Sequence, residues 1–369
     1  MLLRDRLHVK ERVVCINGRF LAQPVRGVQR VARNLTKALD ELARRGEAGN
    51  IRFRLIVPET ATLDTHYHAL TVMRAPFLSG HFWEQIVLPV MSSGHLLVNL
   101  GNTGPLFAGR ALIMIHDAHI YQMPCAYPPL YRAAHKIIHW HARNHWRILT
   151  VSDHSAEALT RWLHLPRERA PLRIYNGADH LDAVEPVVTP AIRTFLERGP
   201  FLLLLDGHAP HKNLEGAVRA LQMVEDLGLN LLVLRNMSHE LAKSALTSSP
   251  RVVFMGQVGD PELKALYMHA AALLAPSRME GFGLPAVEAM RLGCPVIVSQ
   301  NTAMHEIVGE AGFYCDSESP QTIAAAIRAA ISDPSLRAER TEAGIRRSQL
   351  YDWTTSARSL LHVIKAEDV

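Results

Sequence analysis

The chain has 369 residues, of which 48% are hydrophobic, so two domains with full-sized cores are expected and global disorder is excluded. No apolar run approaches the roughly 18 residues that a membrane-spanning helix needs. The net charge of +5 is uneven: residues 1–185 hold 23 Lys and Arg against 15 Asp and Glu, whereas residues 186–369 hold 17 against 20. The first half is therefore expected to face something anionic, such as a membrane surface, unless the imbalance is only an ordinary basic surface.

Charges at positions 4, 5 and 6 do not fit the apolar core of a secretory signal peptide. The four cysteines are scattered, and none belongs to a C-x-x-C pair. This usage is typical of reduced cysteines in a cytosolic protein. We therefore expect a cytoplasmic protein, which could act at the inner face of the cytoplasmic membrane.

In the first half of the chain, short apolar segments alternate with amphipathic ones. The segments RVVCINGRF, IRFRLIVP, HLLVNL, ALIMIHD and ILTVSD read as strands. Residues 27–46 form an amphipathic helix that stops at Gly46, and Ser152 with Asp153 opens another helix. Alternating strands and helices predict a parallel sheet that is covered on both faces.

The segment 184–200, VEPVVTPAIRTFLERGP, contains prolines and is the best linker candidate. The pattern then restarts with FLLLLDG, LNLLVLR, RVVFMGQV, AALLAPS and CPVIVS as strands, separated by helices. The chain is thus predicted to be an α/β protein with two Rossmann-like, doubly wound domains that face each other across a cleft. We expect ligands at the carboxyl ends of the strands and in that cleft.

The segment APSRMEGFGLPAVEAMRLGCPVIVS combines a strand end, a glycine-rich turn and a helix start. Gly281 and Gly283 leave the backbone open for close approach of a ligand. Pro285 suits the first position of the helix, whose free N-terminal amides and positive dipole end favour a phosphate group.

Two glutamates flank this turn: Glu280 just beyond the strand, and Glu288 in what we expect to be the first helical turn. A carboxylate aimed at a phosphate would repel it, so both must contact neutral donors, for which sugar hydroxyls are the obvious choice. A second strand-to-helix turn carries Lys212, with His208 and His211 beside it, and a lysine there suits a diphosphate. Together these features predict a nucleotide-sugar site.

The motif EGFGLPAVE resembles the E-x7-E signature of retaining glycosyltransferases of family 4, which have the GT-B fold. HEIVGEAGFYCD, RIYNGAD, APHKNLEGAVRAL and RVVFMGQVGDPELKALY resemble further family segments in the family's order. In the first half, QPVRGVQRVARNL, FWEQIVLP, NTGPL, MIHDAHIYQMP and TVSDHSAEAL also resemble members, most of all bacterial polysaccharide mannosyltransferases. The resemblance covers nearly the whole chain and is strongest from about 200 to 315.

The resemblance implies roles for individual residues. Glu280 matches the glutamate on the donor hexose, Glu288 the one on the ribose hydroxyls, and Lys212 the lysine on the diphosphate. Gly27 matches a glycine that approaches the diphosphate across the cleft, and His116 a histidine near the reacting end of the donor sugar. Glu280, His116 and Lys212 are thus the expected catalytic residues.

The implied donor-binding loop lies along the diphosphate and comprises Gly281, Phe282, Gly283 and Leu284. Backbone around GQVGDPE, which includes Val258, is expected to contact the nucleotide base. Many members place arginine-type residues near the positions of His208 and His211, where this chain has histidines. Because histidine titrates near neutral pH, the grip on the diphosphate is expected to be weaker or pH-dependent.

The resemblance also implies the reaction. A hexose, with mannose from GDP-mannose as the first choice, would pass with retained configuration to a glycan or lipid-linked saccharide in cell-surface polysaccharide synthesis. The implied route is front-side attack, in which the leaving diphosphate takes the acceptor's proton. No Asp-x-Asp occurs, so we expect neither a metal nor another cofactor. The implied domains are residues 1–185 on the acceptor side, residues 186–349 binding the nucleotide sugar, and a terminal helix at 350–369 that crosses back.

Other readings stay open at this point. GFGLPA also fits the G-x-G-x-x-A fingerprint of NAD-dependent oxidoreductases, although no acidic residue ends the next strand, and a non-catalytic sugar-nucleotide-binding module is a further alternative. Histidines 135, 139, 141 and 145 form two i,i+4 pairs that could bind zinc, but the pairs point to different faces, and a solvated basic helix is the simpler reading.

That same basic helix could dock on an anionic membrane or bind nucleic acid. Membrane docking is the better reading, because no nucleic-acid fold signature accompanies the helix. The residues that we expect at such a membrane contact are Arg132, Lys136, Arg143 and Arg147 beside Tyr131, Trp140 and Trp146.

Overall fold

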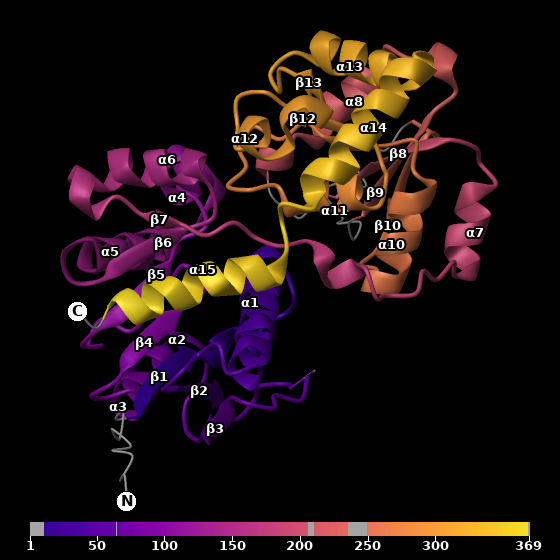
Figure 1. The fold of residues 1–369 in the computed structure, drawn as a ribbon. Coiled ribbons are helices and arrows are strands. Elements are labelled where there is room, and N and C mark those ends of the chain that lie inside the picture. Colours follow the sequence, from indigo (N-terminus) through magenta and orange to yellow (C-terminus); the bar gives the residue numbers. More distant parts are fainter. Residues whose placement is uncertain (1–10, 64, 206–209, 235–248, 368–369) are drawn as a thin grey trace, which may run out of the picture.

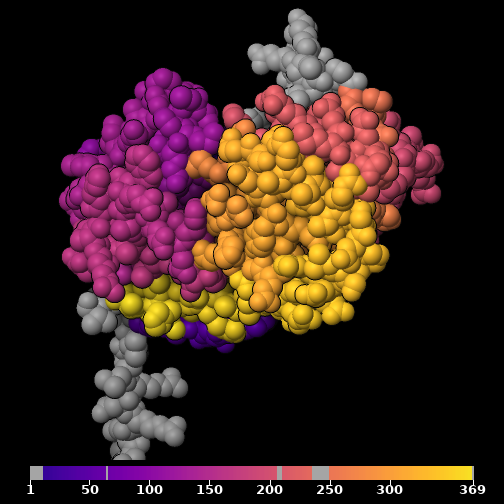
Figure 2. Space-filling model, turned by 90° about the horizontal axis from the view of Figure 1, so that it is seen from above, coloured from indigo at the N-terminus to yellow at the C-terminus, as the bar shows by residue number. Residues whose placement is uncertain are grey.

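The computed structural model describes residues 11–63, 65–205, 210–234 and 249–367. Two α/β domains lie side by side, and the C-terminal helix crosses back from the second domain to the first (Figure 1). In Figure 2 this helix, in yellow, runs along the edge of the N-terminal domain. The predicted fold class is confirmed.

The N-terminal domain is built on a parallel sheet of seven strands in the order β3-β2-β1-β4-β5-β6-β7. Its strands are β1 Arg12–Asn17, β2 Ile51–Pro58, β3 Thr71–Ala75, β4 Leu96–Asn99, β5 Ala111–Met114, β6 Arg147–Thr150 and β7 Leu172–Arg173. Its helices are α1 Gly27–Arg44, α2 Gly80–Phe82, the π-helical turn η2 Trp83–Val87, α3 Leu88–Met91, α4 His119–Gln122, α5 Pro129–His145 and α6 Asp153–Leu163. Short 3₁₀ turns are η1 Gly18–Ala22, η3 Pro124–Ala126, η4 Arg167–Arg169 and η5 Asp179–Leu181.

The C-terminal domain has a parallel sheet of six strands in the order β10-β9-β8-β11-β12-β13. Its strands are β8 Phe201–Leu204, β9 Asn230–Leu234, β10 Val252–Met255, β11 Ala272–Ala275, β12 Val296–Ser299 and β13 Gly312–Cys315. Its helices are α7 Pro190–Leu196, α8 Leu214–Gln222, α10 Asp260–His269, α11 Leu284–Arg291, α12 Met304–Val308, α13 Pro320–Ser332 and α14 Pro334–Ser348, followed by α15 Trp353–Ala366. Its 3₁₀ turns are η6 Pro210–Lys212, η7 Glu225–Leu227 and η9 Gly309–Ala311.

Strand order reverses beside the first strand of each sheet, where β1 pairs with both β2 and β4 and β8 with both β9 and β11. At such a point the loops that leave neighbouring strands diverge, which opens a crevice at the carboxyl ends of the strands. The two crevices belong to different domains, and both contribute to the cavity described below.

The segment 184–200 differs from the expected linker because it contains a helix. Thr189 caps the start of α7, and Pro190 occupies its first turn. Ile192 and Phe195, three residues apart, are buried on one face of that helix. This i,i+3 apolar pair explains why a proline-containing connection still forms a helix.

Core packing divides the N-terminal sheet into two faces. Leu35 of α1 and Leu360 of α15 belong to the cluster on one face. Trp83 of η2 and Ile138 of α5 belong to the cluster on the other face. Within the part of the chain that the structure describes, no helix has the length and apolar character needed to cross a membrane.

Candidate functional site: a cleft between the domains

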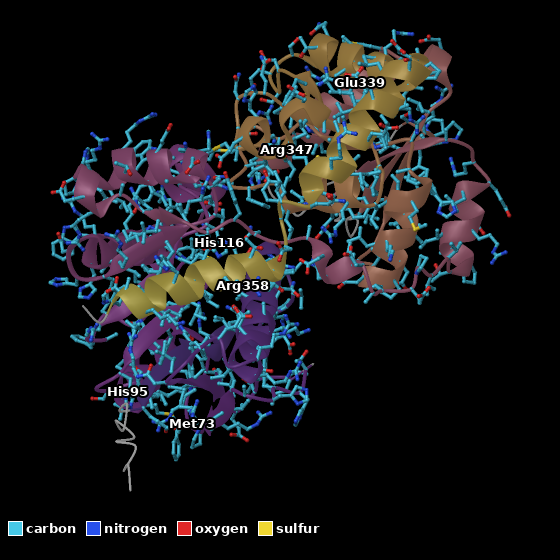
Figure 3. The ribbon with its side chains drawn as sticks, viewed as in Figure 1. Met73, His95, His116, Glu339, Arg347 and Arg358 are labelled. Atoms are coloured by element: carbon cyan, nitrogen blue, oxygen red, sulfur yellow. The ribbon has the colours of Figure 1, made fainter. Side chains whose placement is uncertain are left out.

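A cavity of about 420 Å³ lies between the domains. The N-terminal domain contributes Arg26 and Gly27 at the start of α1, together with His116, which follows β5. The C-terminal domain contributes Lys212 and the loop from Glu280 to Pro285. Figure 3 shows His116 at the edge of the N-terminal domain that faces the C-terminal domain. The structure thus brings together most of the residues that the sequence singled out.

Lys212 and Glu280 lie in direct contact within this cavity. The Lys212 Nζ atom donates a hydrogen bond of 2.6 Å to Glu280 Oε1. The two residues follow β8 and β11, which are neighbours in the sheet. Burial alone would raise the pKa of Glu280, but the Lys212 ammonium outweighs burial and lowers it, so the carboxylate is ionised near neutral pH.

The turn that carries Lys212 is held by Asn213, which the sequence reading did not single out. Asn213 has left-handed backbone geometry with φ +57°, and its side chain accepts a hydrogen bond from the Gly216 N–H at the start of α8. Its Nδ2 group also donates to the carbonyls of Pro276 and Ser317. One asparagine thereby ties the Lys212 turn to the strand that precedes Glu280.

The glycine-rich turn is arranged for an anion. Gly283 caps α11 with φ +88°, and a side chain there would collide with Met304 at 2.5 Å. Glycine has no side chain to cap the helix, so the positive end of α11 stays open to a ligand, although the Ala286 N–H already donates to the Gly283 carbonyl. The helix begins at Leu284, one residue earlier than predicted, so Pro285 is its second residue rather than its first.

A second helix start faces the cavity from the other domain. Gly27 is the first residue of α1, and the preceding Arg26 provides no side-chain cap. No atom lies within 4 Å of the place where a Cβ of Gly27 would be, so a ligand can approach its backbone. The starts of α1 and α11 and the Lys212 ammonium therefore bring positive charge to a cavity whose lining also contains the carboxylates of Asp117 and Glu280.

Glu288 lies deeper than the sequence suggested. It belongs to the second turn of α11, not the first, because that helix starts at Leu284. The residue is 2% exposed, and Glu288 is not among the described residues that line the cavity. Its Oε2 atom accepts a hydrogen bond of 2.9 Å from the Tyr267 hydroxyl, and its Oε1 atom lies 3.1 Å from His180 Nε2.

Three further predicted donor-site residues differ in where they lie. Phe282 lines the cavity, but its ring packs against Tyr175 and Tyr351 and so also serves the core between the domains. Val258 packs, partly buried, against the same core and is not among the described cavity-lining residues. His208 lies outside the described residues.

His116 is a buried, neutral histidine. Its Nε2 atom lies 2.9 Å from the Leu100 carbonyl oxygen, so it must carry the proton that is shared with that acceptor. Its backbone N–H donates to the Asn102 side chain at 2.8 Å. Burial lowers the pKa of His116, which leaves Nδ1 unprotonated near neutral pH.

Burial decides the charge of His211, for which the sequence suggested a weaker or pH-dependent grip on the diphosphate. Burial, with help from the neighbouring Lys212, lowers its pKa to about 4. The imidazole is therefore uncharged across the neutral range. Its ring instead contacts His119 of the other domain, with 4.9 Å between ring centroids.

The histidines of α5 point to two sides, as predicted, but the inner pair is not solvated. His135 and His139 are buried and line the cavity, and His139 contacts the Tyr121 hydroxyl and the Asn102 carbonyl. Within the described ranges, no three His, Cys, Asp or Glu side chains come together as a metal site would require. A pair of histidines satisfied by protein groups explains their burial.

One residue expected at a membrane surface is not there. Trp146 is buried in the core cluster beneath α5, because it closes that helix against the sheet. Arg147 is the first residue of β6, and its guanidinium donates to the Glu168 carbonyl. Lys136 and Trp140 are exposed on α5.

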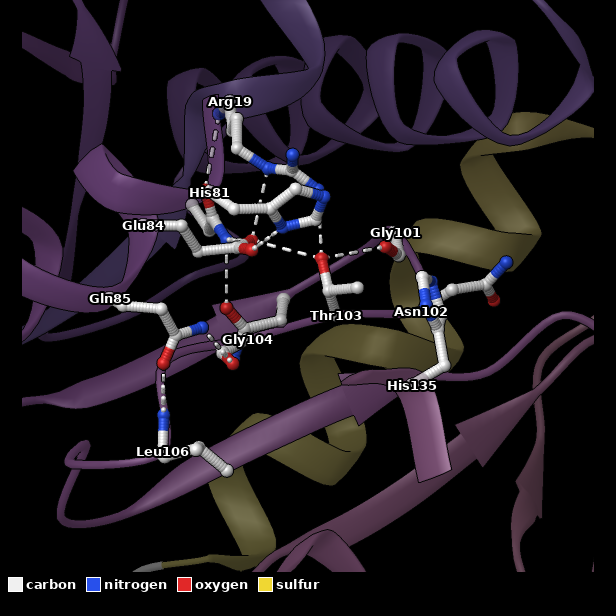
Figure 4. A network of polar contacts seen from close by, with 12 residues as sticks. Arg19, His81, Glu84, Gln85, Gly101, Asn102, Thr103, Gly104, Leu106 and His135 are labelled. Atoms are coloured by element: carbon white, nitrogen blue, oxygen red, sulfur yellow. Dashed lines mark hydrogen bonds and ion pairs between the residues drawn. The ribbon is translucent and has the colours of Figure 1, made fainter. Parts of the chain in front are cut away.

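A polar network near the cavity was not found from the sequence (Figure 4). Glu84 is buried, and its Oε1 atom accepts hydrogen bonds from Asn17, Arg19 and Thr103. His81 lies 3.4 Å from the other carboxylate oxygen. This network joins η1, η2 and the loop after β4, and so fixes the N-terminal wall of the cleft.

Contacts between the domains were also missed. Arg30 of α1 donates two hydrogen bonds, of 2.7 and 3.0 Å, to the Asp260 carboxylate. The Gly281 carbonyl accepts hydrogen bonds from the Ser152 and Ser155 hydroxyls.

Glu306 completes these contacts by capping a helix of the other domain. Its carboxylate accepts hydrogen bonds from the backbone N–H groups of Asp153 and His154 at the start of α6. With the two contacts above, it joins the two domains beside the cavity.

Comparison with known proteins agrees with this architecture. The chain is 27% identical over 267 residues to O-antigen chain mannosyltransferase B of Escherichia coli, covering 69% of this chain and 70% of that protein. The chain is also similar to two further mannosyltransferases, and the matches cover 50% of the length of one and 27% of the length of the other.

Solved structures share the fold at low identity. Sucrose-phosphate synthase from Thermosynechococcus elongatus matches with a TM-score of 0.72 and 20% identity, over 97% of this chain and 99% of that chain. Anabaena Alr3699/HepE in complex with UDP and glucose matches with a TM-score of 0.70 and 17% identity, over 97% and 100% of the two chains. Residues 191–347 match the family of glycosyl transferases group 1. Residues 191–347 are therefore similar to glycosyl transferases group 1, and the chain as a whole has the GT-B fold of these solved structures.

Proposed function

We propose that the chain is a retaining glycosyltransferase that moves a mannosyl group from GDP-mannose to a glycan or a lipid-linked saccharide. The observation that carries this proposal is the cavity in which Lys212 and the starts of α1 and α11 surround one space. Two helix N-termini and a lysine suit a diphosphate. Without them, the carboxylates of Asp117 and Glu280 in the same lining would repel it.

Each residue then has a task in the reaction. Lys212 and the positive N-terminal end of α11 stabilise the negative charge that develops on the departing diphosphate. Because Lys212 is paired with Glu280 at 2.6 Å, an incoming diphosphate competes with that carboxylate for the ammonium. Glu280 accepts hydrogen bonds from hydroxyls of the hexose. Glu288 accepts them from the ribose once donor binding frees its buried carboxylate from Tyr267 or His180.

Front-side attack fits these residues better than a double displacement. A double displacement needs a free carboxylate nucleophile beneath the anomeric carbon, whereas Glu280 is held by Lys212. In front-side attack the leaving phosphate oxygen takes the proton of the acceptor hydroxyl, and the neutral His116 can accept a hydrogen bond from the donor sugar. We propose that the positive charge required comes from Lys212 and the helix starts, without a metal.

The donor sugar is proposed as mannose because of the similarity to O-antigen mannosyltransferase B, and polysaccharide synthesis follows from the same similarity. The acceptor is proposed to enter beside Glu280, where a second hollow of about 200 Å³ opens between the domains. Its lining includes Gln122, Asn301 and Thr302, which can hydrogen-bond to saccharide hydroxyls. We also propose that the basic N-terminal domain meets an anionic membrane that carries the acceptor.

The test is a thermal-shift panel of GDP, UDP and ADP with their sugars, followed by nucleotide release from the preferred donor on addition of a glycolipid acceptor. Saturating ligand at a hundred times its Kd stabilises a protein by about 2.7 kcal/mol, which is readily seen. The proposal expects GDP and GDP-mannose to stabilise most and the acceptor to accelerate GDP release. Stabilisation by no nucleotide diphosphate would contradict it, and binding without donor consumption would indicate a non-catalytic module.

A further inference from the structure

The outer surface of helix 80–91, formed by α2, η2 and α3, is unusually apolar. Phe82, Ile86 and Val90 are each 56–75% exposed and spaced by four residues, so they share one face. The opposite face buries Trp83 and Leu88 in the core. A helix that is apolar on both faces is normally covered on both faces.

The turn before this helix adds two more apolar side chains. Phe77 and Leu78 are exposed and have left-handed backbone geometry, with φ values of 68° and 62°. Bulky residues rarely adopt this geometry, because their Cβ atoms crowd the backbone. The chain therefore holds two large apolar groups in water in a conformation that is itself unfavourable.

Helix α5 covers the same face of the N-terminal sheet and presents a similar outer surface. Its buried side contributes Ile138 to the core cluster that contains Trp83 of η2. Its exposed side carries Leu130, Ile137 and Trp140. We call the exposed side chains of these segments the apolar face, which consists of Phe77, Leu78, Phe82, Ile86, Val90, Leu130, Ile137 and Trp140.

Charge identifies the occupant of the apolar face. Helix α5 carries Arg132, Lys136 and Arg143 and no carboxylate, and helix 80–91 carries one carboxylate, Glu84. Glu84 is buried in its network with Arg19, and Asp117 lines the two hollows between the domains. A second copy of the chain would bring a face of the same sign, whereas an anionic lipid leaflet offers both acyl chains and opposite charge.

We propose that the apolar face inserts into an anionic lipid leaflet, led by Phe82, Ile86 and Val90. This inference rests on the proposed function in one respect: the role of docking, which is to bring a lipid-linked acceptor to the cavity. Helix α5 joins the two sites, because its Tyr131 and His135 line the cavity while its Trp140 lies on the apolar face. Docking would then set the cavity beside the headgroup region.

The test uses the full-length protein and sedimentation with vesicles of phosphatidylcholine, alone or in an equimolar mixture with phosphatidylglycerol. One variant combines Phe82→Gln, Ile86→Gln and Val90→Gln. Its matched control replaces three apolar residues of the C-terminal half by glutamine, and these are 45–62% exposed in the wild type: Met223, Met268 and Leu350. All six positions are on the surface, so both variants are expected to fold.

We expect the wild type and the control to bind the mixed vesicles and to stay partly bound at about 0.5 M salt, where purely ionic attachment is screened. The variant of the apolar face should lose at least about tenfold in partition coefficient, because burial of one such side chain is worth that much. Equal partition of the two variants would overturn the inference. A dimer of the wild type that only the apolar-face variant converts to monomer would overturn it too, and would indicate a second copy instead.

Binding of GDP, measured by calorimetry without vesicles, separates this inference from the proposed function. We expect both variants to bind GDP as the wild type does. If no protein binds a nucleotide while partition behaves as stated, the proposed function fails and the membrane surface stands.

Discussion

Lys212 and Glu280 form an ion pair of 2.6 Å at the centre of the cleft, although they lie 68 residues apart in the chain. Each group is partly buried, so neither charge is well solvated without the other. The pair presets the ammonium at the strand ends where a diphosphate is expected. It also makes the two residues energetically dependent on each other.

The first prediction is that Lys212→Ala lowers turnover by about 10²–10³-fold, the usual effect of removing one group that stabilises developing negative charge. Steady-state kinetics with the preferred donor measures this. Arg219→Ala is the control, since Arg219 pairs with Glu215 on the exposed surface of α8. Turnover within threefold of wild type for Lys212→Ala would contradict the assignment.

The second prediction concerns Glu280→Gln, which keeps the size of the side chain and removes its charge. Turnover should fall, because the hexose loses an ionised acceptor, whereas affinity for GDP should stay unchanged or increase. The reason is that Glu280 no longer competes with the diphosphate for Lys212. Kinetics and calorimetry on one preparation test both parts, and an equal loss of GDP affinity and turnover would mean that the glutamates are misassigned.

The third prediction concerns Glu288, whose burial changes which variant is informative. Glu288→Ala leaves the Tyr267 hydroxyl without its acceptor, which costs about 1–3 kcal/mol of stability and confuses binding with folding. Glu288→Gln keeps an acceptor for Tyr267 and should weaken GDP binding by roughly tenfold or more, as expected for loss of a charge-assisted hydrogen bond. Thermal unfolding provides the control, and unchanged GDP affinity in the folded variant would count against a ribose role.

The sequence predicted most strands because each of these is a short apolar run bounded by turn residues, but it did not predict β3, β7 and β13. It also predicted the turn around Gly283, since a glycine before Pro285 and two flanking carboxylates is a local pattern. It missed Arg30–Asp260, whose partners are 230 residues apart and unremarkable by themselves. Burial of His135 and His139 was missed for another reason: histidines read as polar in a periodic pattern, while Tyr121 and Asn102, the partners of His139, come from other segments.

The fourth prediction concerns acid. Burial lowers the pKa of His139 from its usual 6.5 to about 4. Between these values the unfolded chain binds a proton that the folded chain does not, so stability is fully present above pH 6.5 and is lost as the pH falls toward 4. His139→Gln should reduce this slope by about 1.4 kcal/mol per pH unit, the contribution of one proton.

Denaturant unfolding at a series of pH values measures the slope. His116, His135 and His211 also have lowered pKa values, so the slope should decrease without vanishing. Tyr121→Phe is the matched comparison, because it removes the hydrogen bond to His139 but keeps the imidazole. It should lower stability at every pH and leave the slope as it is, and an unchanged slope in His139→Gln would show that His139 is not the group responsible.

The last prediction concerns Arg30 and Asp260, which join α1 to α10 across the cleft through a bidentate pair. Burial alone would raise the pKa of Asp260, but the Arg30 guanidinium lowers it. The lowered pKa is what an attraction between the two charges produces. The pair is partly exposed, so its coupling energy should be modest, at about 1 kcal/mol.

Arg30 and Asp260 act on closure rather than on the chemistry. Arg30→Ala should therefore favour an open cleft, with a larger radius of gyration in solution scattering without ligand and a raised KM at nearly unchanged kcat. A double-mutant cycle with Asp260→Ala, read out as GDP-mannose affinity, should show that the second substitution costs little once the first is made. Fully additive losses, or a fall in kcat alone, would mean that the two residues do not hold the domains together during donor binding.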